Sequence, residues 1–210
     1  MSDFLLGASG MPPLPAASEA TRDPGDLLRA WVAEAERSGV REALAATLAT
    51  ASPEGIPSSR TLRLAALSAD GVVFGTSAAS RKGRDLAANP VASVTVYWRE
   101  LALQLRLDGG VEVLEADASD ALFADRPPAA RAATVVSEQD AALDDLAVLR
   151  ARAESLAAAG APIARPADWW GYRLVPSSIE FWQGSPDRLH RRLRYERADG
   201  GAWSVRGLQP

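Results

Sequence analysis

The chain has 210 residues, 47% of them hydrophobic and 24% charged, and a formal net charge of −4. These values predict a soluble globular protein with one domain and argue against a general nucleic-acid binder. With no cysteine and a single histidine, His190, the chain has no disulfide, no thiol nucleophile and no histidine-based metal cluster.

Residues 1–22 are rich in Pro, Ala, Gly and Ser and show no hydrophobic period. We therefore expect a flexible N-terminal arm followed by a single domain over 23–210. The arm lacks the cationic start and the long apolar run of a signal peptide, and no apolar run in the chain is long enough to span a bilayer. The expected location is the cytoplasm, with no membrane partner.

One amphipathic helix is predicted from residue 26, where apolar residues recur at helical spacing between Pro24 and a C-capping Gly39. A second, short helix is expected over 81–88, with Ser80 as its N-cap and Asn89-Pro90 at its end. Short strands bounded by turns are predicted at 44–52, 58–67, 72–76, 91–98 and 101–109.

The strand over 101–109 alternates strictly, with leucines on one face and Gln104 and Arg106 on the other. Further helices are expected at 119–127 and 138–160, and further strands at 171–183, 192–197 and 202–208. Antiparallel strands dominate this order, with helices between them. The pattern favours a mainly β fold with peripheral helices (α+β), a closed or nearly closed β-barrel, over a βαβ array.

Three clusters of cations are candidates for an anion site. The first is Arg60-Thr61-Leu62-Arg63 in a strand. The second is Ser80-Arg81-Lys82-Gly83 at a helix start, where free backbone N–H groups and the helix dipole favour a phosphate. The third is the arginine-rich stretch 188–194 around His190. Each cluster alone is also consistent with a solvated surface that pairs with Asp and Glu.

In chain order, these clusters together with Gln104, Gln139 and Trp182 resemble the pyridoxamine 5′-phosphate oxidase family, over about residues 26–210. The most specific matching segments are SRKG (80–83), EFWQG with RLHRR (180–192) and LQP (208–210). The resemblance implies a split β-barrel that binds FMN at a homodimer interface. The implied cofactor contacts are Arg60, Thr61, Leu62, Arg63, Leu64, Ala65, Gly75, Thr76, Ser80, Arg81, Lys82, Gln104, Gln139, Asp140, Trp182 and Arg192. Gly75 and Asp140 stand where the family usually has Tyr and Ser.

The chain differs from the family at the residues that would bind the substrate. The vitamin B6 enzymes hold the substrate phosphate with a Lys, a Tyr, an Arg and a Ser, and these positions here are Ala65, Leu122, Arg126 and Ala130. Each lost partner of a bound phosphate costs about 1.5–3 kcal/mol. Pyridoxamine phosphate is therefore not the expected substrate.

A different branch, the flavin oxidases of phenazine biosynthesis, is more similar. The matching segments are DLLRAW (26–31), GVRE (39–42), GVVF (71–74), VYWRE (96–100) and RLHRRLRY (188–195). This resemblance implies oxidation of a reduced phenazine carboxylic acid-type compound, with O2 as electron acceptor and H2O2 as product. Ala65, Leu122 and Ala130 would form an apolar wall for the flat substrate.

The resemblance also implies roles for the arginine-rich stretch. Arg188 and His190, with Arg126, are expected to hold the substrate carboxylates, and His190 is the candidate proton acceptor. Arg191 and Arg194 are expected to point outward and pair with surface acids. Two alternatives stay open: a pyridoxamine/pyridoxine 5′-phosphate oxidase with a rearranged phosphate pocket, and a non-catalytic flavin-binding protein.

Overall fold

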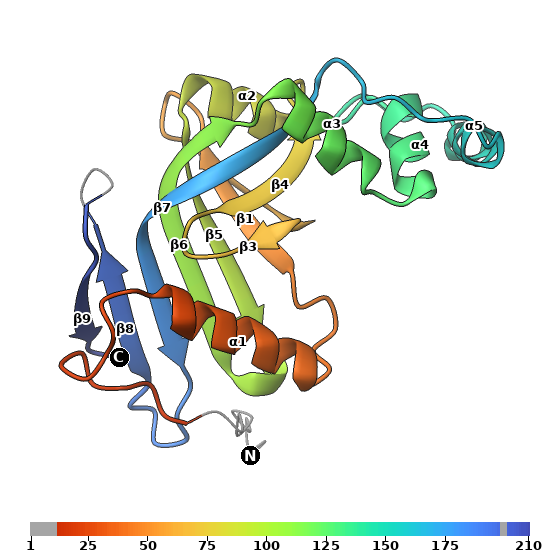
Figure 1. Ribbon diagram of the computed structural model, residues 1–210. Helices are drawn as coiled ribbons and strands as arrows, with labels where there is room; N and C mark the ends of the chain where they lie inside the picture. Colours follow the sequence, from red (N-terminus) through yellow and green to blue (C-terminus); the bar gives the residue numbers. More distant parts are fainter. Residues whose placement is uncertain (1–11, 198–200) are drawn as a thin grey trace.

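A computed structural model describes residues 12–197 and 201–210 of the chain. Its centre is a curled, nine-stranded antiparallel sheet with the order β2-β1-β5-β6-β7-β4-β3, in which β8 pairs with β7 and β9 pairs with β8 (Figure 1). The strands are β1 Ala45–Ala51, β2 Pro57–Arg63, β3 Ala66–Leu67, β4 Val72–Ser77, β5 Val91–Trp98, β6 Leu103–Val113, β7 Trp169–Gln183, β8 Arg191–Glu196 and β9 Ser204–Leu208. The mainly β fold with peripheral helices is confirmed.

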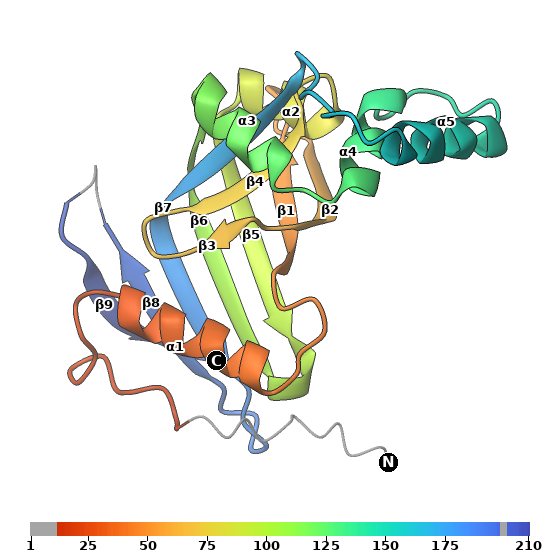
Figure 2. The same ribbon diagram turned by 45° about the vertical axis from the view of Figure 1, so that its right-hand side comes forward.

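The helices form three groups around the sheet. They are α1 Gly25–Arg37, α2 Arg81–Ala88, α3 Ala116–Ala124, α4 Pro128–Val136 and α5 Leu146–Ala158, with a 3-10 turn η1 at Arg99–Leu101. α1 lies across one face of the sheet, α2 and α3 lie at one end of the strands, and α4 and α5 project away from the sheet (Figures 1 and 2). No helix in the described ranges is long and apolar enough to cross a bilayer.

The long strand β7 joins two parts of the sheet. Residues 169–174 of β7 pair with β4, residues 178–183 pair with β8, and β6 pairs along both parts. Between these parts lies Pro176, which has no N–H to donate to a ladder. The β6 register also shifts between Asp108 and Gly109, opposite this point. The sheet therefore divides where β7 changes its partner strand.

The core lies between the inner face of the sheet and α1. Leu103, Leu105 and Leu107 are fully buried, which confirms the predicted alternation along β6. From α1, the Trp31 ring packs edge-on against Phe181, with ring centroids 5.1 Å apart. Burial of one such large apolar side chain contributes about 1.5–3 kcal/mol. This packing fixes α1 on the sheet and leaves the opposite face of β6 to Gln104 and Arg106.

Several segments differ from the sequence prediction. The strand expected over 101–109 is β6, which begins two residues later and extends to Val113, and the helix expected over 119–127 is α3 at Ala116–Ala124. The helix expected over 138–160 begins only at Leu146, because the Asp145 carboxylate accepts hydrogen bonds from the backbone N–H groups of Ala147 and Val148 and so caps the helix there. The strand expected over 58–67 divides into β2 and β3. α4 was not predicted; it begins with Pro128 at its first position, a residue that suits a helix start.

The described part of the expected N-terminal arm contacts the barrel. Leu14 is buried, and its backbone N–H donates to Oε1 of Gln183 over 2.8 Å. Arg191 in turn donates to the carbonyl oxygen of Leu14 over 3.4 Å. Residues 12–14 therefore lie against β7 and β8, and residues 1–11 fall outside the described ranges.

Candidate cofactor and substrate site

A cluster of cations and hydroxyl groups lies at the start of α2. Ser80 caps this helix as predicted, since its Oγ accepts from the backbone N–H of Gly83 over 3.3 Å. Lys82 is buried, and its Nζ donates to the same Oγ over 3.1 Å. Thr76, at the end of β4, lies with its Oγ1 3.5 Å from that atom. Helix start, lysine and two hydroxyl groups thus converge on one point.

Arg60 reaches this cluster from β2. Its guanidinium donates to Thr50 Oγ1 over 2.9 Å, and Thr50 donates to the buried Asp85 of α2 over 2.7 Å. Burial lowers the pKa of Arg60; the charge of Asp85 opposes this shift, and the charge of Arg81 adds to it. Burial likewise lowers the pKa of Lys82, and the charge of Arg60 adds to that effect. Arg60, Arg81 and Lys82 thus bring several positive charges close together, and such a donor set suits a dianion.

Gly83 keeps this helix start close to the strand before it. A Cβ atom at Gly83 would lie 2.5 Å from the carbonyl oxygens of Ser77 and Ala78, too close for any real side chain. The first turn of α2 is therefore packed directly on backbone. Its exposed N–H groups are partly taken already, because Asp140 accepts from the backbone N–H of Arg81 over 2.8 Å. The donor set of this cluster fits the phosphate of FMN.

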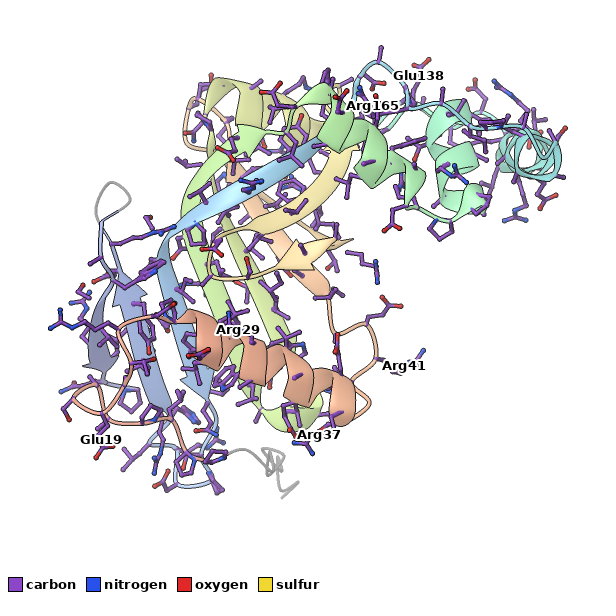
Figure 3. All side chains as sticks on the ribbon, viewed as in Figure 1. Glu19, Arg29, Arg37, Arg41, Glu138 and Arg165 are labelled. Carbon is purple, nitrogen blue, oxygen red and sulfur yellow. The ribbon has the colours of Figure 1, made fainter. Side chains whose placement is uncertain are left out.

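A cavity of about 790 Å³ opens beside the cluster, between β4 and the connections of α3, α4 and α5. It is lined by Gly75, Thr76, Gln139 and Asp140, which were predicted to contact the cofactor, and by Arg126 and Trp169. Glu138 also lines it, and Figure 3 labels this residue at the end of the molecule that carries α3 and α4. The structure thus brings these predicted residues to one hollow.

Arg126 forms part of the cavity wall. Its Nη1 donates to Thr134 Oγ1 over 2.9 Å, and its guanidinium carbon lies 5.5 Å from the centre of the Phe123 ring. Burial lowers the pKa of Arg126. Among the described residues it forms no ion pair. The wall therefore holds a partly buried cation without a carboxylate of its own.

The apolar wall expected from Ala65, Leu122 and Ala130 is not formed at this cavity, because none of these three described residues lines it. Leu122 packs beside the Gly75–Gly171 pair of β4 and β7, since a Cβ atom at Gly171 would lie 3.0 Å from its Cδ2. Ala130 is linked to Arg126 through Thr134, whose hydroxyl donates to the Ala130 carbonyl over 2.9 Å. Ala65 lies on the other side of β4, where its N–H donates to the Val73 carbonyl over 2.8 Å.

A second group lies on the outer face of the sheet. Gln104, Trp182 and Arg192 are direct cross-strand partners on β6, β7 and β8, so their side chains share one row. The His190 ring lies 4.8 Å from the Trp182 ring, and its Nδ1 accepts from the backbone N–H of Ser185 over 3.1 Å. Arg188 is exposed in the same β7–β8 connection and has a positive φ of 68°.

One protomer does not bring these two groups together. α2 leads directly into Val91 at the start of β5, whereas Gln104 pairs with Tyr97 near its end. At about 3.3 Å per residue, β5 places these points roughly 20 Å apart. The two groups therefore occupy separate places on one protomer.

Arg194 pairs with the partly exposed Glu196 as predicted, but it also pairs with a buried acid. It shares a strand face with Arg192, two residues away, and both donate to Glu180 over 2.8 Å. Glu180 is buried, and Arg106 approaches it to 3.4 Å. Burial alone would raise the pKa of Glu180, but the hydrogen bonds from Arg192 and Arg194 outweigh it and lower the pKa. Arg191, on the opposite face, is exposed as expected, but its partner among the described residues is the Leu14 carbonyl and not the expected surface acid.

The other predicted cofactor contacts on the strand expected over 58–67 differ in exposure. Thr61 and Arg63 are exposed on β2, and Leu62 is half-buried. The side chain of Leu64 is buried in the core, so only its backbone is left for a ligand.

Trp169 lines the cavity, although it is not among the predicted site residues. Its signal was the Trp169-Trp170-Gly171 run at the start of β7.

Comparison with known proteins identifies the family to which the chain belongs. Residues 32–160 match the family described as pyridoxamine 5′-phosphate oxidase. The chain belongs to this family. Residues 169–210 match the pyridoxine 5′-phosphate oxidase C-terminal dimerisation region, which supports a homodimer. The pyridoxine/pyridoxamine 5′-phosphate oxidase of Burkholderia vietnamiensis strain G4 is 44% identical over 196 residues, 92% of each chain. That of Gluconobacter oxydans is 42% identical over 90% of this chain and 94% of its own.

Solved structures agree with the family assignment. PhzG from Burkholderia lata 383, in complex with tetrahydrophenazine-1-carboxylic acid, is 41% identical with a TM-score of 0.89, over 97% of this chain and 100% of that chain. An FMN-binding protein from Nostoc punctiforme shares the fold at 22% identity, with a TM-score of 0.71 over 87% of this chain and 95% of its own. The protein is therefore an FMN-dependent oxidoreductase of the split-barrel fold.

Proposed function

We propose that this member of the family oxidises a reduced phenazine carboxylic acid-type compound. The observation that carries the proposal is the residue set at the expected substrate positions. Where the vitamin B6 enzymes hold a phosphate, the corresponding positions here are Leu122 and Ala130, which offer no side-chain donor, and Arg126, which lines the cavity. The likeness to PhzG over nearly the whole of both chains supports the same reading.

FMN, when bound, supplies the two-electron chemistry, and dioxygen as final acceptor leaves as hydrogen peroxide. The start of α2 with Arg60 and Lys82 would hold its phosphate. Gln104, Trp182 and Arg192 of the partner copy would complete the cofactor site, together with Gln139 and the strand over Arg60–Ala65. Glu180 fixes the guanidinium of Arg192 through two charge-assisted contacts, so this arginine is oriented before any ligand arrives.

His190 is suited to bind the substrate rather than to take a proton. Because its Nδ1 accepts a hydrogen bond from Ser185, the neutral ring carries its proton on Nε2. That atom is then a donor, which matches a carboxylate oxygen. His190 and Arg188 of the partner copy, together with Arg126, would hold the anionic edge of a flat substrate. Stacking and orientation then supply most of the acceleration for a compound that is already easily oxidised.

The test follows the flavin absorbance anaerobically after mixing with reduced phenazine-1-carboxylate or with pyridoxamine 5′-phosphate. We expect rapid bleaching by the phenazine acid and slow bleaching by the phosphate compound. Oxygen is then admitted, and one peroxide should form per substrate oxidised. Bleaching by the phosphate compound alone would overturn the proposal.

A second function, pyridoxine/pyridoxamine 5′-phosphate oxidase, is favoured by the names of relatives that are 42–44% identical over nine-tenths of the chain. It requires a phosphate to bind where Leu122 and Ala130 offer no donor. The same mixing experiment separates the two functions.

A further inference from the structure

The indole of Trp169 lies directly over Gly75. Trp169 stands at the start of β7, diagonally across from Gly75 on β4, which pairs with Gly171. A Cβ atom at Gly75 would overlap Cζ2 and Cη2 of the Trp169 ring. The ring can therefore occupy this position only because residue 75 has no side chain.

The same ring holds Arg126. The guanidinium carbon of Arg126 lies 5.2 Å from the centre of the Trp169 ring, and Phe123 packs edge-on against that ring at 5.1 Å. Arg165 secures the Trp169 backbone from outside by donating to its carbonyl oxygen over 2.6 Å. A guanidinium over an aromatic face is attracted to it, typically by about 0.5–2 kcal/mol. The position of Arg126 thus depends on the ring, and the position of the ring depends on Gly75.

We propose that Gly75 and Trp169 are a matched pair that makes the cavity selective for anionic substrates by holding the Arg126 guanidinium at its wall. Trp169 is the positioning residue and Arg126 is the group that meets the anion. The inference rests on the proposed function, since the anion is the carboxylate of that substrate. It adds a reason why this carboxylate is preferred over an uncharged ring of the same shape.

The alternative is that Trp169 only fills space. It is 3% exposed, so its loss would open a cavity in any case. The two roles differ in one respect: space-filling acts equally on charged and uncharged ligands, whereas positioning of Arg126 acts on the charged ligand alone. Binding of stable, oxidised compounds reports this difference without any turnover.

The experiment measures the dissociation constants of the FMN-loaded protein for phenazine-1-carboxylate and for phenazine. The variants are Trp169→Leu, Trp169→Phe, Gly75→Ala, Arg126→Leu and the double variant of Trp169→Leu with Arg126→Leu. We expect the wild type to prefer the acid. That preference should fall about five- to tenfold in Trp169→Leu and Gly75→Ala and persist in Trp169→Phe, which keeps an aromatic face. The double variant should be no worse than Arg126→Leu alone.

Three results would overturn the inference: a wild type without preference, an unchanged preference in Trp169→Leu or Gly75→Ala, or additive losses in the double variant. If Trp169→Leu does not fold, Gly75→Ala against Trp169→Phe decides the matter. Should the preference behave as expected while reduced phenazine-1-carboxylate fails to bleach the flavin, the proposed function fails and the paired role of Gly75 and Trp169 stands.

Discussion

The Nζ atom of Lys82 lies 3.1 Å from the Oγ atom of Ser80, the residue that caps the helix on which Lys82 stands. A buried ammonium is thereby directed at the N-terminus of its own helix rather than at a carboxylate. The helix dipole and the charge of Arg60 both disfavour a second cation there. The carboxylate of Asp140 partly offsets these effects, and a bound phosphate would offset them further.

Replacement of Lys82 by Met should weaken FMN binding. Loss of one charge-assisted contact to the phosphate is expected to raise the dissociation constant by about ten- to a hundredfold. Because the pKa of Lys82 is lowered in the apoprotein, its charge is lost at a lower pH than that of a free lysine, about 10.4. FMN affinity in the wild type should therefore fall as the pH rises towards that value, and the Met variant should show a flatter profile.

Fluorescence quenching of FMN measures the FMN dissociation constants of the wild type and of the Lys82→Met variant at each pH. Arg99→Met is the matched control, since Arg99 is exposed and its nearest acid is 4.0 Å away. Equal affinity and equal pH profiles in the Lys82 variant and the wild type would contradict a phosphate at the start of α2.

Replacement of Glu180 by Gln should lower the free energy of unfolding at pH 7. It should also make that free energy change less between pH 7 and pH 3. The folded pKa of Glu180 lies below its ordinary value, so its contribution is present above about pH 4.3 and is lost as the pH falls through the folded pKa. We expect a loss of about 2–3 kcal/mol at pH 7, less than for a fully buried pair because Arg192 and Arg194 keep some exposure.

Urea unfolding of apoprotein between pH 3 and 7 measures this effect. Glu196→Gln is the control, because Glu196 also pairs with Arg194 but is 40% exposed and should contribute under about 1 kcal/mol. A Glu180 variant with the stability of this control at every pH would show that the buried carboxylate carries no net stability.

Replacement of Gly83 by Ala should destabilise the protein although alanine is the better helix former. In an exposed helix the change typically gains about 1 kcal/mol. Here the added Cβ meets the carbonyl oxygens of Ser77 and Ala78, so α2 must move away from the strand. A net loss of about 1–3 kcal/mol and weaker FMN binding are expected, measured by thermal unfolding and by FMN titration. Gly207→Ala, where a Cβ would meet nothing within 4 Å, is the control. A gain in stability with unchanged FMN affinity would refute the close packing of α2.

Local pattern was enough to predict much of the fold. The cap at Ser80, the strand over 91–98 and the alternating leucines of β6 all depend on neighbours close in sequence, and the structure has them where the sequence indicated. The loop over 138–145 was mistaken for helix because its composition favours helix, while the capping Asp145 and the positive φ of Asp140 decided otherwise.

What the sequence determined by itself is therefore the set of elements and the kinds of side chain they carry, because helical and strand periods and caps act over a few residues. The tertiary structure alone decided which cations meet: Arg60 and Lys82 converge from β2 and α2, Arg194 turns to buried Glu180, and Trp169 covers Gly75. These contacts depend on strand register and on a ring's fit over a missing side chain. Both arise from pairing of residues far apart in the chain, which no local pattern encodes.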